Sequence, residues 1–108
     1  MAGRGEGLPS RPRREVAADH LERYLATTAA ALAKVRVAAP ERSHHHRLAS
    51  DFLDMARSYY GDALHFRDAG DLVNALSCVN YAHGWLDAGA RLGLFDVGGD
   101  DRLFTLAE

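Results

Sequence analysis

Cysteine, lysine and long apolar runs are scarce in this chain of 108 residues. The single cysteine, Cys78, excludes an intrachain disulfide and a zinc site built from several cysteines, and it favours a reducing, cytoplasmic compartment. Apolar runs of about 18 residues and a signal peptide are both missing, so we expect no insertion into a membrane. Lys34 is the only lysine, which leaves little basis for Schiff-base chemistry.

Motifs for catalysis are missing as well. No glycine-rich loop between a strand and a helix is followed by Lys-Ser or Lys-Thr, which excludes the usual phosphate-binding loop. No serine lies in a nucleophile elbow, and Cys78 lacks an evident basic neighbour that would activate its thiol. The sequence therefore leans away from an enzyme, and we predict neither catalytic residues nor a cofactor.

The composition that remains is globular, with 47% hydrophobic and 26% charged residues and a net charge of −2. This small charge conceals a division along the chain. Residues 1–14 contain four arginines and one glutamate, a charge of +3, whereas residues 15–108 carry −5. Glycine and proline are frequent in the first segment, so we predict a flexible basic arm followed by a single domain. We interpret the arm as a solvated tail, and contact with nucleic acid is the alternative.

Apolar side chains recur at alternating spacings of three and four residues in three segments, which is typical of amphipathic helices. Pro40 ends the first helix, while Gly70 and Asp71 form a tight hairpin between the second and third helices. Short connections make successive helices antiparallel neighbours, so the predicted fold is all-α, an up-down-up three-helix bundle. The predicted elements are helices over residues 15–38, 41–69 and 72–92 and a tail over residues 94–108.

One stripe of each helix is expected to face the core, and each stripe contains one polar residue: Thr28, Asp62 or His83. We predict that His83 is buried and hydrogen-bonded to Thr28, Ser58 or Tyr59, because an unpaired buried nitrogen costs about 1–3 kcal/mol. The predicted stripes are Ala18, Leu21, Leu25, Thr28, Leu32 and Val35; Leu48, Phe52, Met55, Tyr59, Asp62 and Phe66; and Leu72, Leu76, Val79, His83, Leu86 and Ala90.

The third helix has a second apolar stripe, formed by Cys78, Tyr81, Trp85 and Leu92, so two neighbouring helices cannot cover all of it. The expected cover is the tail, which reverses at the glycines of residues 98–99 and packs on this helix. The alternative cover is a second copy of the protein. Tyr81, Trp85 and Leu92 are therefore the candidate interaction surface.

A candidate polar cluster lies on the same two helices. Asn80, His83 and Asp87 are spaced at i, i+3 and i+7 on the third helix, and Asp62 and His65 at i and i+3 on the second. Histidine and carboxylate at this spacing can hold a metal or act as acid and base. The pair on the second helix, however, lies about five residues, or roughly 7 Å, from the level of His83. We therefore favour a structural hydrogen-bond cluster over a metal or catalytic site.

The segment from Asp51 to Val97 resembles a small archaeal family, domain of unknown function 357. The resemblance rests on the Tyr-x-Asp-Ala-x-x-Phe element at residues 60–66, on Gly-Asp and Asn-Ala at residues 70–71 and 74–75, and on the segment YAHGWLDAGARLG at residues 81–93. It implies a compact, spectrin-like helical bundle from an archaeal cytoplasm, without an established activity.

A looser similarity connects the third helix with helical domains that accompany minimal nucleotidyltransferases, some of which are toxin ribonucleases. The ribonuclease form needs an arginine a few residues before the histidine, and Ser77, Cys78 and Val79 stand there instead. The sequence thus favours a non-catalytic protein-interaction or scaffolding module, whose partner is another protein or a second copy. The alternative is a nucleic-acid-related binding domain that uses the arm and His83.

Overall fold

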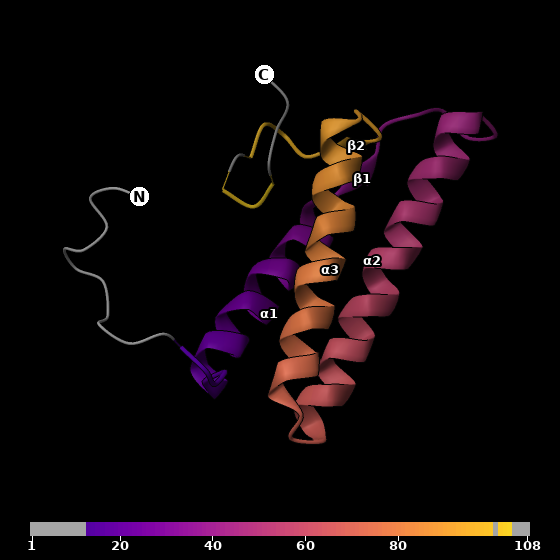
Figure 1. Cartoon of the computed structure of the whole chain (residues 1–108). Coiled ribbons are helices and arrows are strands. Elements are labelled where there is room, and N and C mark those ends of the chain that lie inside the picture. The colour runs from indigo at the N-terminus through magenta and orange to yellow at the C-terminus, as the bar shows by residue number, and fades with distance from the viewer. Residues whose placement is uncertain (1–12, 101, 105–108) are drawn as a thin grey trace.

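The computed structural model describes residues 13–100 and 102–104 (Figure 1). Its three helices run up, down and up, which confirms the predicted all-α fold. Of the predicted arm, only the part from Arg13 onward lies within the described residues. In that described part of the chain, no helix is both long and apolar enough to cross a membrane. The elements are α1 (Ala18–Lys34), β1 (Arg36–Val37), α2 (His44–Asp68), α3 (Leu72–Arg91) and β2 (Phe95–Asp96).

The first helix ends earlier than predicted, and a short strand pair replaces its last turn. Val35 is extended, and the two residues of β1 pair with β2 in antiparallel fashion, Arg36 opposite Asp96. The amide of Ala38 adds a hydrogen bond to the Leu94 carbonyl at 3.0 Å. The predictions of helix to residue 38 and of no strand here are both wrong, because a two-residue strand shows no periodicity and satisfies its backbone groups by tertiary pairing.

The ends of α2 and α3 are fixed by local chemistry. Arg42 has a positive φ of 68°, so α2 begins after it, at the N-cap Ser43, whose Oγ accepts from the His46 amide at 3.0 Å. At the hairpin, Gly70 has a φ of 83°, and Asp71 accepts from the Asn74 amide at 3.1 Å. The predicted glycine C-cap and aspartate N-cap are confirmed, whereas the predicted start of the second helix at residue 41 is three residues early.

Small residues line the contact between α2 and α3, which pack closely along their length. They are spaced seven apart, which places each row on one side of its helix and lets the two backbones approach closely. The predicted core stripe of α2 is therefore wrong: its large side chains lie beside this row, half-buried, and Asp62 is exposed. The buried rows are Ala49, Ala56 and Ala63 on α2 and Ala75, Ala82 and Gly89 on α3.

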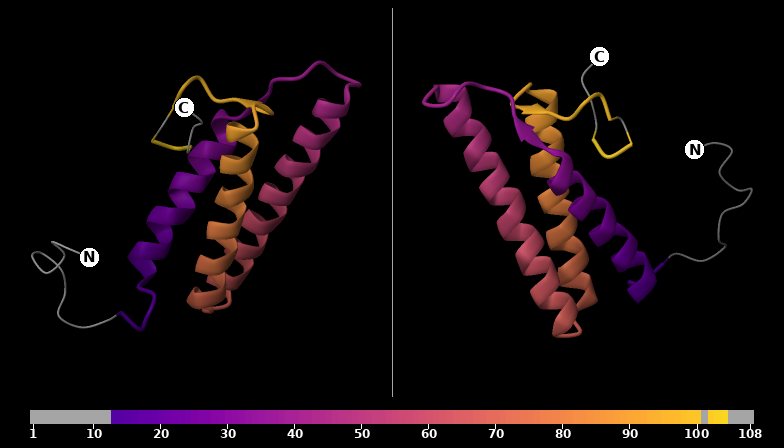
Figure 2. Two further views of the ribbon diagram at one scale, coloured as in Figure 1. Left: turned by 45° about the horizontal axis from the view of Figure 1, so that its top comes forward. Right: turned by 180° about the vertical axis from the view of Figure 1, so that it is seen from behind.

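The remaining helix, α1, packs against α3 and makes few contacts with α2. Its buried side is formed by Leu21, Leu25, Thr28 and Ala31. The predicted stripe is thus right for Leu21, Leu25 and Thr28, whereas Ala18 is exposed and Leu32 and Val35 are half-buried. Figures 1 and 2 show α1 on one side of the α2–α3 hairpin, with no described helix on the opposite side. The hairpin therefore has a covered face and an open face.

The segment after α3 completes the core on the covered side. Gly93, with a φ of 77°, ends α3 as predicted, and Leu94, Phe95, Val97 and Phe104 are buried. The Phe95 ring lies on Gly89, where an added Cβ would overlap it. The tail thus packs on α3, as predicted, while Leu106 lies outside the described residues.

Candidate functional site

His83 is the centre of the predicted polar cluster, and it joins three segments of the chain. Its Nδ1 lies 3.0 Å from Thr28 Oγ1 on α1, and its Nε2 lies 2.6 Å from the carbonyl oxygen of Leu103 in the tail. A carbonyl can only accept, so Nε2 carries a proton and, in the neutral ring, Nδ1 accepts from the Thr28 hydroxyl. The predicted bond to Thr28 is confirmed, but the His83 side chain is 22% exposed rather than fully buried.

A hollow of about 350 Å³ opens beside His83 at the seam between α1 and α3. It brings together three residues that the sequence singled out, Asn80, His83 and Asp87. The Asp87 carboxylate lies 3.7 Å from His83 Nε2, which is longer than a hydrogen bond. The full lining consists of Tyr24, Thr27, Thr28, Asn80, His83, Gly84 and Asp87.

The other two members of the predicted cluster do not join it. Asp62 and His65 are exposed on α2 and are not among the residues lining the hollow, because α1 rather than α2 packs on the His83 side of α3. Within residues 13–100 and 102–104, no group of three or more His, Cys, Asp and Glu side chains is placed to hold a metal ion. The five predicted residues therefore do not form one site.

Two of the contributors to this cluster that the sequence did not predict are informative. Tyr24 lies one helical turn before Thr28, and this i, i+4 spacing predicts that the two side chains lie on the same side of α1. The other is the backbone carbonyl of Leu103. It could not be predicted from the residue type, because every residue has a backbone carbonyl. The spacing of the helical stripes thus predicted Thr28 among the side-chain partners of His83, but it did not predict the main-chain partner.

Asp100 holds the tail in the position that His83 needs. Its Oδ1 accepts from the amides of Arg102 and Leu103, each at 3.0 Å, and its Oδ2 lies 3.2 Å from Lys34 Nζ. The Leu103 amide, followed by that of Arg102 and by Lys34, lowers the pKa of the Asp100 carboxyl, against a smaller opposing effect of desolvation. This turn ties the tail to the end of α1 and presents the Leu103 carbonyl to His83.

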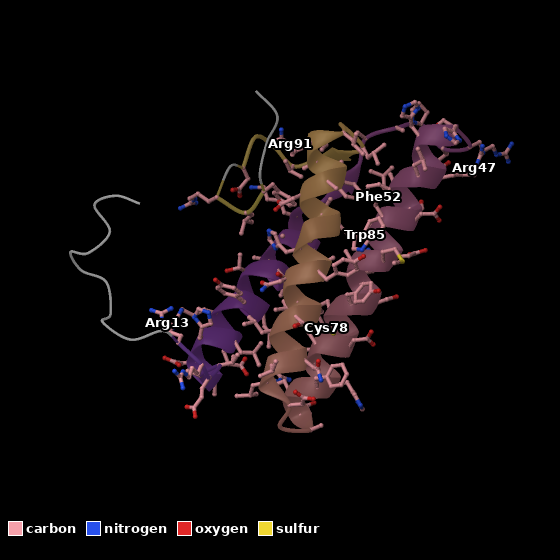
Figure 3. All side chains as sticks on the ribbon, viewed as in Figure 1. Arg13, Arg47, Phe52, Cys78, Trp85 and Arg91 are labelled. Carbon is pink, nitrogen blue, oxygen red and sulfur yellow. The ribbon has the colours of Figure 1, made fainter. Side chains whose placement is uncertain are left out.

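The open face of the hairpin carries four rings, Phe52, Tyr59, Tyr81 and Trp85, together with the exposed Leu92, and we call this surface the aromatic face. Phe52 meets Trp85 edge-on at 5.0 Å between centroids, and Tyr59 meets Tyr81 at 4.6 Å. Tyr81 and Trp85 lie 6.3 Å apart along α3, also edge-on. Figure 3 shows Phe52 and Trp85 between α2 and α3. Edge-to-face pairs of this kind contribute about 0.5–1.5 kcal/mol each beyond their burial.

Much of this face is accessible in the described part of the chain. Tyr81 is 53% exposed, Leu92 is 65% exposed and Trp85 is half-buried. A shallow, mainly apolar hollow of about 250 Å³ is lined by Tyr81, Gly84, Trp85 and Ala88. An added Cβ at Gly84 would meet nothing within 4 Å.

The described residues of the tail leave Tyr81 and Leu92 more than half exposed, so the prediction that the tail covers them is wrong. The tail packs on α3 at Gly89, where the missing side chain makes room for the Phe95 ring. This glycine lies on the covered side of α3. The close approach at Gly89 is thus made by a side chain of the tail. Gly84, which lines both the hollow beside His83 and the hollow of the open side, receives no such contact from the described residues.

Cys78 lies on the predicted second stripe of α3 and is half-buried. Desolvation by burial raises the pKa of its thiol, and the carboxylates of Asp62 and Asp71 raise it further. The thiol is therefore protonated at neutral pH and is a poor nucleophile.

Comparison with known proteins gives one result that bears on all of these features. No curated protein and no solved structure matches the chain. Residues 23–95 match a family described as "Protein of unknown function (DUF357)". The matched range begins in the second turn of α1, includes Thr28, His83 and the whole aromatic face, and ends at Phe95. This range is well over half of the sequence, so the resemblance noted above is confirmed and the chain belongs to the DUF357 family.

Proposed function

We propose that this protein is a non-catalytic interaction module that binds a protein partner through the aromatic face. The observation that carries the proposal is the pairing of four rings across α2 and α3, one of which, Tyr81, is more than half exposed, as is Leu92 on the same face. Contiguous exposed apolar surface marks interaction sites, and buried aromatic anchors dominate the binding energy of such sites.

The state of His83 supports a role without catalysis. Both of its ring nitrogens are engaged by the protein itself, one by the Thr28 hydroxyl and the other by the Leu103 carbonyl. A general acid or base needs a nitrogen within reach of its substrate. A ring held in this way connects α1, α3 and the tail.

The charges around the aromatic face favour a protein over a polyanion. Asp51 and Asp62 are exposed on α2, at helical spacing from Met55 and Tyr59 on the edge of that face. Carboxylates at the rim repel the phosphates of nucleic acid and the headgroups of an anionic membrane.

Affinity capture from the native host with two matched variants tests this function. Tyr81→Ser removes an exposed ring from the aromatic face, and Tyr24→Ser removes one of similar exposure, 40%, from α1. We expect the first variant to lose the protein partner that the wild type captures and the second to keep it. Equal recovery by the two variants, or loss in both, contradicts the proposal.

A second candidate function rests on a different hollow. Arg13, Arg14, His20 and Arg23 line a space of about 510 Å³ at the start of α1, where the predicted basic arm joins the domain, together with acidic and apolar residues. Such a cluster can contact RNA phosphates. RNA binding that weakens steeply with added salt, and that falls when residues 1–14 are removed, supports this function. Equal binding of RNA by the full-length and shortened proteins contradicts this second function.

A further inference from the structure

The aromatic face has a notch between two projecting side chains. The notch is the shallow hollow on α3 at Gly84, Trp85 and Ala88, of which Gly84 and Ala88 carry little or no side chain. Tyr81 projects on one side of it and Leu92 on the other, and these are the two most exposed large apolar residues of this face. The three parts lie on one side of α3, because their spacings of three and four residues follow the helical repeat.

This arrangement is complementary to itself. In an antiparallel crossing of two α3 helices about a two-fold axis at the centre of the notch, each residue meets the one equally far beyond the centre. Tyr81 and Leu92 lie about 7.5 and 9 Å from that centre at 1.5 Å per residue, so Tyr81 of one copy packs against Leu92 of the other, twice. Gly84 and Ala88 at the crossing let the two helices approach to the short end of the usual 8–10 Å range.

From this match, and resting on the function proposed above, we infer that the protein partner of the aromatic face is a second copy of this chain. The two copies cross antiparallel at Gly84 and Ala88 of α3. The resulting interface is isologous, so one patch supplies both of its halves.

The distribution of charge selects this crossing among the symmetric alternatives. Asp51 and Asp62 are exposed along the α2 edge of the face. A dimer in which α2 crossed α2 would bring these carboxylates together, and like charges at an interface disfavour the contact. A crossing centred on α3 keeps the two acidic edges apart on the outside. It also leaves the contacts of His83 with α1 and the tail unchanged.

The molar mass of the full-length protein in solution tests the inference, measured by sedimentation equilibrium over a wide range of concentration. We expect the mass to rise from 11.8 kDa toward twice that value. The chain offers a matched pair of variants, because Gly84 and Gly61 are both exposed within helices and an added Cβ meets nothing within 4 Å at either position. Gly84→Gln fills the notch, whereas Gly61→Gln lies on the other side of α2.

Both variants should fold with an unchanged or raised Tm, because glycine disfavours a helix. We expect Gly84→Gln to weaken self-association by tenfold or more and Gly61→Gln to leave it unchanged. A wild type that stays at 11.8 kDa throughout, or equal self-association of the two variants, overturns the inference.

A disulfide trap tests the pairing of Tyr81 with Leu92. In a Cys78→Ser background, Tyr81→Cys with Leu92→Cys should give a covalent dimer on oxidation. Within one copy the two positions are about 16 Å apart, well beyond the roughly 7 Å that a disulfide spans between Cα atoms. Tyr24→Cys with Leu92→Cys is the control and should remain uncrosslinked, and equal crosslinking of the two pairs overturns the pairing.

The capture experiment separates the two levels of the argument. If the wild type is monomeric and Tyr81→Ser still loses a different captured protein, the second copy is wrong and the interaction module stands. If the wild type is monomeric and capture is independent of Tyr81, both fail.

Discussion

The two sides of α3 offer a direct comparison, because one helix presents a covered side and an open side to different surroundings. On the covered side, Val79 and Leu86 are fully buried in the core, and His83 engages α1 and the tail through one ring nitrogen each. On the open side, Tyr81 and Trp85 stack edge-on with rings of α2. The covered side is thus fixed by mixed polar and apolar contacts within the chain, whereas on the open side Tyr81 and Leu92 are more than half exposed in the described part of the chain.

The largest contrast is expected between two leucines of this region. Leu86 is fully buried and Leu92 is 65% exposed. Leu86→Ala should lower the free energy of unfolding by about 2–5 kcal/mol, because it removes buried methylene groups and leaves a cavity. Leu92→Ala should change it by less than about 0.5 kcal/mol. Urea denaturation of both variants at low protein concentration measures the difference, and similar losses would mean that the two sides are equally covered.

The two glycines of α3 should respond in opposite directions. At Gly89 an added methyl group overlaps the Phe95 ring, so Gly89→Ala should destabilise the fold by about 1–3 kcal/mol. At Gly84 it meets nothing within 4 Å, so Gly84→Ala should stabilise the helix by up to about 1 kcal/mol. Thermal unfolding compares them, and a shift of Tm in the same direction for both would contradict the placement of the tail.

Loss of the Thr28 hydroxyl, which binds His83, should lower the stability of the protein more than loss of the Thr27 hydroxyl. Thr28→Val keeps the shape of the side chain and leaves His83 Nδ1 without its partner, which should cost about 1 kcal/mol. Thr27→Val is the control, since the Thr27 hydroxyl binds only the Arg23 carbonyl on the exposed side of α1. Equal stability of the two variants in urea would show that the covered side does not depend on this hydrogen bond. The ¹⁵N shifts of His83 in the wild type should report a proton on Nε2.

Acid should loosen the covered side through Asp100, with the smallest effect of the four. The pKa of this carboxyl is lowered in the folded protein, first by the Leu103 amide and then by Arg102 and Lys34. Its contribution to stability is therefore present above the unfolded pKa of about 3.9 and is lost as the pH falls through the lower folded value. The stability difference between wild type and Asp100→Asn, followed by urea denaturation, should be constant near neutral pH and shrink below about pH 4. A difference that persists unchanged into strong acid would exclude this origin.

Local rules predicted the parts of the fold that depend on neighbours in sequence. The hairpin caps at Gly70 and Asp71, the end of α3 at Gly93 and the buried side of α1 all follow from residue type and spacing. The stripes also predicted a hydrogen bond from His83 to Thr28, Ser58 or Tyr59, because a buried polar group needs a partner, and the structure shows that the partner is Thr28.

The prediction of which side of α2 is buried was wrong for a physical reason. Periodicity weights large side chains, and Phe52, Met55 and Tyr59 form a regular stripe beside the alanines that make the contact. Both faces of the hairpin are apolar, so the pattern indicates a helix without showing which face meets α3. The sequence pattern also did not show on which side of α3 the tail packs, because this depends on which glycine of α3 leaves room for the Phe95 ring.

The contacts of the tail also have a consequence for the order of folding. The α2–α3 hairpin is local in sequence, so it can form as soon as both helices have been synthesised. α1 packs on α3 through Leu21 and Leu25, and it is also joined to the tail, through Lys34 to Asp100 and through Thr28 and His83 to Leu103. α1 is synthesised before α2 and α3, but its contacts with the tail can form only after residue 103 has been added.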